Sequence, residues 1–321
     1  MLRILKNHEG KVRQTTFDEI KSLDVDWIDC YKPDEKELAL LVKKTKLPIN
    51  RLRVYLHDDG RPHVLEMKNF SLVVFAAPII KDNTIKRTIV SIFLFGSNNI
   101  LTLHNEKIDA LERVEKHIKE GHLNLLDNPS HFLFALLDEI TNDYFNLLER
   151  LQEDVDLLEE QIVKNPKITH TEQILNFKKN VIYVHKALTA NREVIVNIEK
   201  GYLSRIEKGE IDKYRFIYND IVQLIDMNET YRDVLTGALE IYLTTISNNL
   251  NHTVKRLTAW GSLILIPTLI ASIYGMNFHD TTSPFNMPEL TWKYGYFFAL
   301  GVMALSTLLL FLYFRRKDWI K

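Results

Sequence analysis

The chain has a single cysteine, Cys30, among its 321 residues. One thiol cannot form an internal disulfide, and it cannot supply the clustered cysteines of a zinc or iron–sulfur site. The charges are nearly balanced, with 41 Lys and Arg against 42 Asp and Glu. A general nucleic-acid binder normally carries a clear excess of basic residues, so this balance predicts no nucleic-acid partner.

The sequence also lacks the short motifs of common enzymes. It contains no Gly-rich phosphate loop, no nucleophile elbow and no histidine pair with the spacing of a metal hydrolase. The 11 histidines are scattered along the chain. We therefore predict that the protein is not an enzyme, uses no organic cofactor and has no nucleotide-driven pump machinery.

Two stretches near the C-terminal end lack charge altogether, residues 257–278 and 294–314. Each has about 21 residues, or roughly 31 Å as a helix, which matches a hydrocarbon core about 30 Å thick. We expect two transmembrane helices, with everything before them facing water. Basic residues at 255–256 and 315–317 flank the spans, whereas the loop at 279–293 has a single lysine. The positive-inside rule then places both termini in the cytoplasm of a cell whose plasma membrane the protein crosses.

The N-terminal region, residues 1–128, mixes short strand and helix patterns. Strands are expected at 25–30, 53–57, 64–67, 72–75, 88–95 and 99–104, where Val, Ile, Phe and Tyr are frequent. Helices are expected from Pro33 through Val42 and from Ile108 to Lys119. Cys30 lies in an alternating apolar strand, so a buried thiol is expected. The pattern predicts an α/β or α+β domain without fixing the strand order.

From Pro129 onward apolar residues recur at helical spacing and strand signals stop. A first helix ends at Asn165–Pro166, and a second is expected at about 171–206. A third begins near Ile211 and meets no proline until Pro267. A helix of about 65 residues must pack against copies of itself or against the two preceding helices.

The expected organisation is therefore an α+β fold in six segments. They are an α/β cytoplasmic domain at 1–128, a helical hairpin and stalk at 129–256, a pore-lining span at 257–278, an outer loop at 279–293, a second span at 294–314, and a basic tail at 315–321.

One face of the third helix is mostly small and polar. Steps of three or four residues meet Glu240, Thr244, Ser247, Asn251, Val254, Thr258, Ser262, Leu265 and Thr268. Such a face is costly against lipid, and two spans cannot enclose a channel. A ring of identical subunits, each giving this face to a central pore, resolves both problems. Alternatively, the Ser and Thr hydroxyls bond to carbonyls of their own helix.

Acidic residues gather on the first helix of the hairpin. They are Asp138, Glu139, Asp143, Glu149, Glu153, Asp154, Asp156, Glu159 and Glu160. Two interpretations remain open: a solvated helix face, or an acidic field that concentrates cations near the inner mouth of the pore.

The sequence Tyr-Gly-Met-Asn at 274–277, followed by Met-Pro-Glu-Leu at 287–290 between two C-terminal spans, resembles the CorA family of magnesium transport proteins. The basic tail Arg-Arg-Lys-Asp-Trp at 315–319 is similar as well. The resemblance is strong over about 231–321, and over the N-terminal part it concerns only the order of the domains.

The resemblance implies a homopentamer in a lipid bilayer that carries divalent cations, chiefly Mg²⁺ and often Co²⁺ or Ni²⁺, passively inward. Gly275, Met276 and Asn277 would form the outer selectivity ring. Below it the polar face would line the pore, with Leu257 and Val254 near a hydrophobic narrowing. The outer-loop acids Asp280 and Glu289 would raise the local cation concentration.

The family also carries regulatory divalent-metal sites between neighbouring cytoplasmic domains. Here the chain departs from the pattern, because Phe216 and Asn219 stand where members often have Asp. The candidate ligands are Asp82, Asp212, Asp220, Asp226 and Glu229, for which ordinary surface acids are an equally open interpretation.

Two other functions remain open alongside Mg²⁺ transport. A Zn²⁺ transporter of the same superfamily tends to carry Ile between the Gly and the Asn, so Met276 argues against it. A membrane-anchored divalent-cation sensor predicts no continuous polar face entering the span.

Overall fold

The computed structural model describes residues 2–8, 11–14, 27–47, 49–56, 60–81, 84–96, 99–122, 124–276, 287, 289 and 292–320. Its internal contacts divide the chain into two compact units, Met1–Leu239 and Glu240–Lys321. We call them unit 1 and unit 2. The segment boundaries expected from the sequence at 128 and 256 remain predictions.

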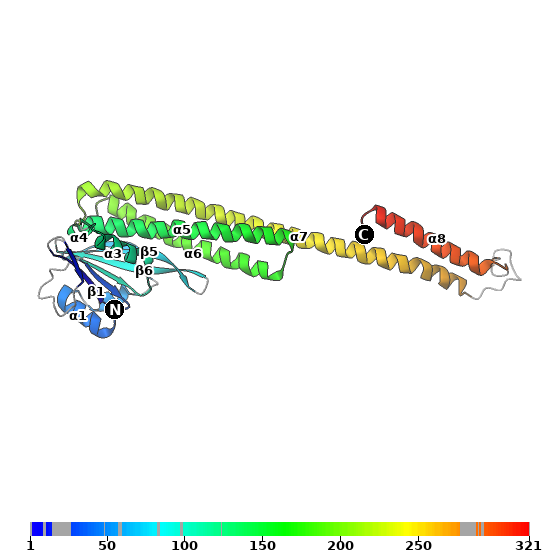
Figure 1. The fold of residues 1–321 in the computed structure, drawn as a ribbon, viewed down its shortest axis with the longest axis horizontal. Helices are drawn as coiled ribbons and strands as arrows, with labels where there is room; N and C mark the ends of the chain where they lie inside the picture. The colour runs from blue at the N-terminus through cyan, green and yellow to red at the C-terminus, as the bar shows by residue number, and fades with distance from the viewer. Residues whose placement is uncertain are drawn as a thin grey trace. The chain divides into compact units, whose positions relative to one another are not determined.

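Unit 1 is built on a seven-stranded mixed sheet (Figure 1). Its strands are β1 (Leu2–His8), β2 (Lys11–Gln14), β3 (Trp27–Tyr31), β4 (His63–Glu66), β5 (Phe70–Lys81), β6 (Thr84–Phe95) and β7 (Asn99–His104). They lie in the order β2-β1-β3-β7-β6-β5-β4. Only the β3–β7 pair among these neighbours is parallel. The long β5–β6 hairpin contributes much of the core, because it is buried on both faces over most of its length.

Helices cover the sheet and continue beyond it. They are α1 (Glu35–Thr45), α2 (Ile49–Val54), α3 (Asp109–Lys119), α4 (Asn124–Asp127), α5 (Pro129–Lys164), α6 (Ile168–Glu199), the 3₁₀ helix η2 (Lys208–Lys213) and α7 (Tyr214–Tyr274). Their ends follow local chemistry. At α1, the Asp34 side chain accepts from the Glu37 amide while the Glu37 side chain accepts from the Asp34 amide, a capping box. At α5, Pro129 occupies the first turn behind the N-cap Asn128.

The side-chain amide of Asn191 fixes helix α6 to β5. It makes the hydrogen bonds to the β5 backbone that a neighbouring strand would make. Strand β4 pairs with β5 only as far as Val74, which leaves the next edge of β5 without a strand neighbour. There the Ala76 amide donates to Asn191 Oδ1 and the Asn191 amide donates to the Ala76 carbonyl, both at 2.9 Å. Tyr144 of α5 donates to the same carbonyl at 3.1 Å. These bonds satisfy a buried strand edge and hold both long helices against the sheet.

The structure confirms most of the expected elements and corrects others. The predicted strand at 53–57 is wrong: Arg53 and Val54 end helix α2, Tyr55 and Leu56 form a turn, and residue 57 lies outside the described residues. Strands β1 and β2 were not predicted. The second helix of the hairpin begins at Ile168 and ends at Glu199, earlier than expected. Cys30 is fully buried, and burial raises the pKa of its thiol.

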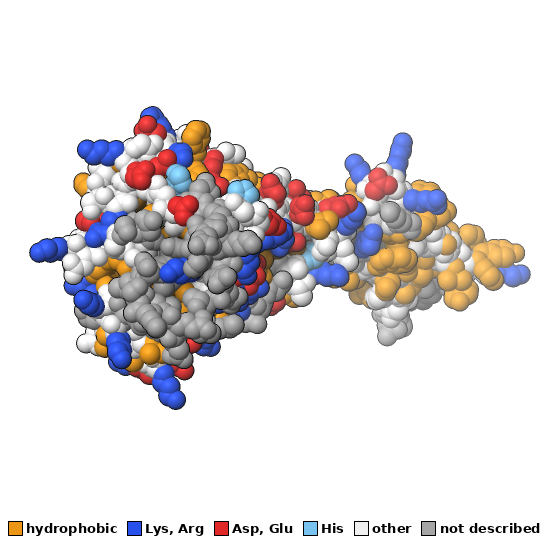
Figure 2. Space-filling model, turned by 60° about the vertical axis from the view of Figure 1, so that its left-hand side comes forward, with side chains coloured by type: hydrophobic (Ala, Val, Ile, Leu, Met, Phe, Trp, Pro, Cys, Tyr) orange, Lys and Arg blue, Asp and Glu red, His pale blue; other side chains and the backbone are white. Residues whose placement is uncertain are grey.

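Unit 2 contains the C-terminal part of α7 and helix α8 (Gly295–Arg316). Ala259 and Leu263 of α7 are buried in one small apolar cluster with Phe314 and Ile320. Hydrophobic side chains also gather on the outside of this unit, at the right of Figure 2. The stretch Lys208–Tyr274 and α8 are long and apolar enough to cross a membrane by length and composition.

The C-terminal end of α8 closes in a Schellman motif. Trp319 N–H donates to the Phe314 carbonyl, and Asp318 N–H donates to the Arg315 carbonyl. Asp318 takes the left-handed conformation, with φ 56°, and the Trp319 ring stacks on Phe314 at 5.3 Å. The tail thereby returns to the cluster that joins α8 to α7.

Candidate functional site

The polar face of α7 lies away from the surface that α8 covers. At 100° per residue, Asn251, Thr258 and Leu265 project roughly 80–160° around the helix from Ala259 and Leu263. Nine of the ten predicted pore-lining side chains are exposed and Ser262 is half-buried. The exposed nine are Glu240, Thr244, Ser247, Asn251, Val254, Leu257, Thr258, Leu265 and Thr268. Within unit 2 the chain therefore leaves this face uncovered.

One hydroxyl on this face bonds to a carbonyl of its own helix, as the alternative interpretation of the polar face predicts. Thr268 Oγ1 donates to the Ile264 carbonyl of its own helix at 2.8 Å. Thr253, on another face, does the same with Asn249 at 2.9 Å. Such a hydroxyl keeps its oxygen lone pairs free to accept from water, so the bond to the helix does not remove it from the lining of an aqueous path.

The predicted selectivity residues begin where α7 ends. Gly275 N–H donates to the Ala271 carbonyl at 2.9 Å, and Met276 N–H donates to the Ile273 carbonyl at 3.1 Å. Gly275 does not take a left-handed conformation, and a Cβ there would lie 3.4 Å from two helix carbonyls. That distance is an ordinary van der Waals contact, so within one chain neither the backbone conformation nor the space around it requires glycine at this position. Asn277 and Asp280 lie outside the described residues.

Glu289 of the outer loop connects the ends of both spans. The Tyr274 hydroxyl donates to Glu289 Oε1 at 3.3 Å. A Cβ on Gly295, at the start of α8, would lie only 2.0 Å from the Glu289 carbonyl oxygen. Only glycine fits there, so the loop backbone is seated on the first turn of α8. The Glu289 carboxylate is thus engaged by Tyr274.

The described candidates for regulatory acids lie in unit 1 and are not gathered into one metal site. Asp212, Asp226 and Glu229 are exposed, Asp220 is half-buried, and Asp82 lies outside the described residues. Over the described part of the chain, no group of three or more His, Cys, Asp or Glu side chains is arranged to hold a metal ion.

The structure does bring one candidate beside an acid of another helix. Burial raises the pKa of Asp138 on α5, and the charge of Asp220 on α7 raises it further. Burial also raises the pKa of Asp220. Sequence spacing carries no signal for this pair, because the two acids lie on helices whose mutual register only the fold determines.

Part of the acidic face of α5 is neutralised inside the chain. Arg113 of α3 lies 2.5 Å from Glu139 and 2.6 Å from Asp143. Glu160 pairs with Lys164 one turn later, at 2.5 Å. These acids join helices or cap turns, which favours the structural interpretation for them.

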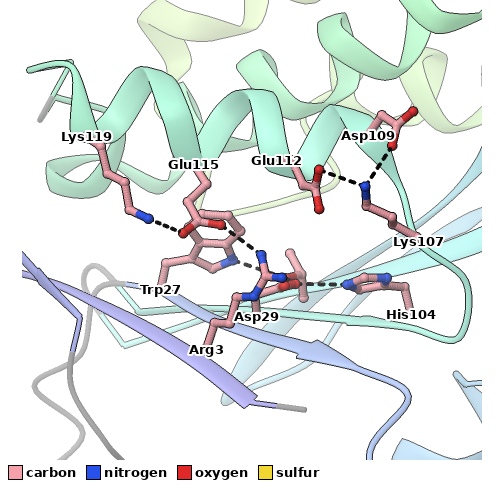
Figure 3. A network of polar contacts seen from close by, with 10 residues as sticks. Arg3, Trp27, Asp29, His104, Lys107, Asp109, Glu112, Glu115 and Lys119 are labelled. Atoms are coloured by element: carbon pink, nitrogen blue, oxygen red, sulfur yellow. Dashed lines mark hydrogen bonds and ion pairs between the residues drawn. The ribbon is translucent and has the colours of Figure 1, made fainter.

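Unit 1 contains a buried polar network with a His, an Asp and a Thr, residue types that also occur in catalytic sites (Figure 3). Trp27 Nε1 donates to Thr102 Oγ1 at 3.1 Å, and Thr102 Oγ1 donates to Asp29 Oδ1 at 2.6 Å. His104 lies between Asp29 Oδ1 at 3.0 Å and the Glu106 carbonyl at 2.7 Å. Both ring nitrogens are therefore occupied by oxygen partners. No nitrogen of His104 is left to act on a substrate.

The charged residues above this network are paired as well. Glu115 of α3 accepts from Arg3 at 3.1 Å and from Lys119 at 2.6 Å, and Lys107 lies 3.0 Å from Glu112 (Figure 3). The Arg3–Glu115 pair ties α3 to β1, and the buried bonds tie β3 to β7. We interpret it as structural.

An α+β unit followed by two apolar C-terminal helices, one of them with an uncovered polar face, defines an integral membrane protein with an N-terminal water-facing part. The family model described as "CorA-like Mg2+ transporter protein" matches residues 22–316. The chain therefore belongs to this family.

Curated relatives and solved structures agree with this assignment. The chain is 32% identical over 317 residues to the cobalt/magnesium transport protein CorA of Methanocaldococcus jannaschii, covering 97% of each chain. It is 30% identical over 267 residues to the CorA protein of Thermotoga maritima, covering 83% of this chain and 74% of that one. The complete structure of the M. jannaschii CorA magnesium transporter matches with a TM-score of 0.85 at 29% identity, covering 100% of this chain and 99% of that one. This match confirms the expected α+β fold with a long helix and two C-terminal apolar helices.

More distant structures share the fold alone. The full-length CmaX protein matches with a TM-score of 0.73 at 16% identity, covering 98% of this chain and 97% of that one. The ZntB cytoplasmic domain from Vibrio parahaemolyticus matches with a TM-score of 0.62 at 11% identity, covering 77% and 98%.

Proposed function

We propose that the protein is a homopentameric channel for Mg²⁺, and also for Co²⁺ or Ni²⁺, in the plasma membrane, with both termini in the cytoplasm. The observation that carries this proposal is the polar face of α7, which continues from Glu240 to Thr268 and which α8 leaves uncovered. Family membership and the names of the two curated CorA relatives support the transported ion. Five copies would turn each face toward one axis.

The ring of Gly275, Met276 and Asn277 would select the ion at the outer mouth. Mg²⁺ prefers six oxygen ligands and releases its water slowly. Neutral Asn amides can hydrogen-bond to this water shell without stripping it, whereas a carboxylate ring would hold the ion longer. The pore-lining residues below, with Val254 and Leu257 at the narrowing, would then pass the hydrated ion.

The membrane potential would drive uptake. A doubly charged ion moving down an inside-negative potential gains about 4.6 kcal/mol per 100 mV. No nucleotide-driven step is needed for accumulation of this size, in keeping with the lack of a phosphate loop in the sequence.

A Zn²⁺ transporter of the same superfamily is the second candidate, and a membrane-anchored cation sensor is the third. The ZntB domain resembles unit 1 at only 11% identity, so it supports the fold and not the ion. The uncovered polar face argues against a sensor without a pore, because such a protein has no use for polar residues along a span.

The deciding experiment is cation uptake by the purified protein in liposomes under an inside-negative potential. We expect Mg²⁺ uptake by the wild type and its loss, by at least tenfold, in Asn277→Ala, with the oligomer intact by size-exclusion chromatography. Asn249→Ala is the matched control, since Asn249 lies on α7 but off the polar face, and it should transport normally. Normal Mg²⁺ uptake by Asn277→Ala would disprove the selectivity ring. Zn²⁺ uptake without Mg²⁺ uptake would favour the second candidate.

We also propose feedback regulation by intracellular Mg²⁺, with ligands among Asp82, Asp212, Asp220, Asp226 and Glu229. Because the described residues hold no such cluster within one chain, the ligands would come from two neighbouring subunits. Divalent binding near Asp138 and Asp220 would offset the burial, and then the repulsion from Asp220, that raise the pKa of Asp138.

Thermal unfolding with and without millimolar Mg²⁺ tests this regulation. We expect Mg²⁺ to raise the melting temperature of the wild type and to raise that of Asp220→Asn by less than half as much. Asp233→Asn, an exposed acid on the same helix, is the control and should respond like the wild type. Equal shifts in all three proteins would remove Asp220 from the regulatory site.

A further inference from the structure

Two segments of unit 1 that are distant in sequence lack acidic residues and carry several basic ones. Residues 84–105, which include β6, contain no Asp or Glu, and neither do residues 173–192 of α6. In a chain with 42 acids this is a marked local departure from charge balance. Their Lys and Arg residues are Lys86, Arg87, Lys178, Lys179, Lys186 and Arg192.

The fold brings these two segments together around one cleft. The cleft has a volume of about 610 Å³ and is lined from β6 by Thr84, Ile85, Lys86 and Arg87, and from α6 by Asn176, Lys179, Asn180, Tyr183 and Lys186. Asn180 is buried at its base and accepts from the Ile85 amide at 3.4 Å, which fixes the helix against the strand. We call this surface the basic cleft. Its volume lies within the range of about 300–1,000 Å³ typical of small-molecule sites.

The described residues show how the four cations of the basic cleft are paired. Within the described part of the chain, none of Lys86, Arg87, Lys179 and Lys186 forms an ion pair. The network of Figure 3 is the contrast, because there Arg3, Lys107 and Lys119 are each matched with an acid. Four unpaired cations around one concave surface create a positive potential that a compact anion relieves.

The polar groups beside these cations suit phosphate oxygens. Asn176 offers an exposed amide that can donate to an anion, whereas the Thr84 hydroxyl already donates to the Lys81 carbonyl at 2.7 Å. Tyr183 is 51% exposed and presents its ring at the wall of the cleft. An exposed aromatic ring next to phosphate-binding cations provides a surface on which a flat heterocycle can stack.

We propose that the basic cleft binds a small polyanion with two or more phosphate groups, held by Lys86, Arg87, Lys179 and Lys186. The site is independent of the ion pathway, since every one of its residues belongs to unit 1 and none belongs to the polar face of α7. It adds an anion site to a protein whose proposed cargo is a cation.

Isothermal titration calorimetry on the full-length protein in detergent and in divalent-free buffer tests the proposal. The probes are inorganic pyrophosphate and ADP, with sulfate as a simple anion. We expect both phosphate compounds to bind at a ratio of one per chain, at least tenfold more tightly than sulfate. Tighter binding of ADP than of pyrophosphate would identify Tyr183 as a stacking surface, and Tyr183→Leu should then reduce ADP binding to the level of pyrophosphate.

Charge-matched variants separate a built site from general attraction. We expect Lys86→Gln/Lys179→Gln to weaken pyrophosphate binding at least tenfold. Lys36→Gln/Lys43→Gln removes the same charge from exposed positions on α1 and should bind like the wild type. Absence of binding by the wild type, or equal loss in both double variants, would overturn the proposal. Both pairs are exposed, so all variants should retain the melting temperature of the wild type.

Discussion

Unit 1 and unit 2 treat their large apolar side chains in opposite ways. In unit 1, Leu72, Phe75 and Phe93 are at most 1% exposed, in a core that one chain completes by itself. In unit 2, Leu257 is 73% exposed and Phe297 is 69% exposed. The first pattern is that of a water-soluble domain, and the second leaves an apolar surface far larger than isolated exposed residues explain.

The difference shows where each unit finds its stabilising partners. Unit 1 satisfies strand edges, helix ends and most buried polar groups internally, as at Asn191 and Ala76. Among its described residues, unit 2 buries a small internal cluster around Ala259, Leu263 and Phe314, and it leaves most of its other apolar side chains open to contact with lipid or with another chain. In the channel proposed above, the polar face of α7 would find a third environment, water at the centre of an oligomer.

The largest expected effect concerns Asn191, whose side-chain amide bonds to the edge of β5. Its substitution tests whether unit 1 is stabilised by contacts within one chain. We expect Asn191→Ala to destabilise the protein by about 2–4 kcal/mol, because two buried hydrogen bonds are lost and the Ala76 amide has no partner. Urea unfolding followed by the fluorescence of the buried Trp27 measures the effect. Asn176→Ala, an exposed position on the same helix, should change stability by less than about 0.5 kcal/mol. A similarly small effect of Asn191→Ala would mean that another group replaces the bond.

In unit 2 the corresponding test concerns the close approach between Gly295 and Glu289. We expect Gly295→Ala to destabilise the folded protein by about 1–3 kcal/mol, since its Cβ forces the loop backbone away and disturbs the contact with Tyr274. The melting temperature in detergent and the rate of Mg²⁺ uptake would both fall.

Gly301→Ala is the control within the same helix, because a Cβ at Gly301 meets nothing within 4 Å. It should have no measurable effect in the isolated chain. If Gly301→Ala proved more harmful than Gly295→Ala, α8 would pack closely against another copy at Gly301. Unit 2 would then owe part of its stability to a contact between chains.

The sequence predicted the long helices well because apolar periodicity over 30 or more residues is a strong signal. It failed at residues 53–57, where Arg53, Val54 and Tyr55 favour a strand locally but a short helix forms in its place. Strands β1 and β2 were missed because their pairing depends on β3, which itself lies parallel to the distant β7. Strand order rests on such non-local pairing, which local spacing cannot reveal.

The candidate site divides in the same way. The polar face of α7 could be predicted because helical spacing alone puts residues such as Asn251 and Thr258 on one side. The electrostatic effect of Asp220 on Asp138 and the close approach of Gly295 to Glu289 depend on how separate segments meet. The basic cleft likewise has no motif, and its signal is the absence of acids from two distant segments.

The smallest expected effect lies at the C-terminal cap of α8, where Asp318 has a left-handed backbone conformation that costs a non-glycine residue about 1–2 kcal/mol. We expect Asp318→Gly to stabilise unit 2 by about 0.5–1 kcal/mol, because glycine takes this conformation freely but loses more chain entropy on folding. The melting temperature in detergent should rise by a few degrees at most.

Asp318→Ala separates conformation from charge: it removes the same carboxylate but keeps the strained backbone, so it should give no stabilisation. If both variants stabilised equally, the carboxylate would be the unfavourable group. If neither did, contacts outside the Schellman motif would fix the tail to α7, and the internal cluster of unit 2 would be stronger than its few buried residues indicate.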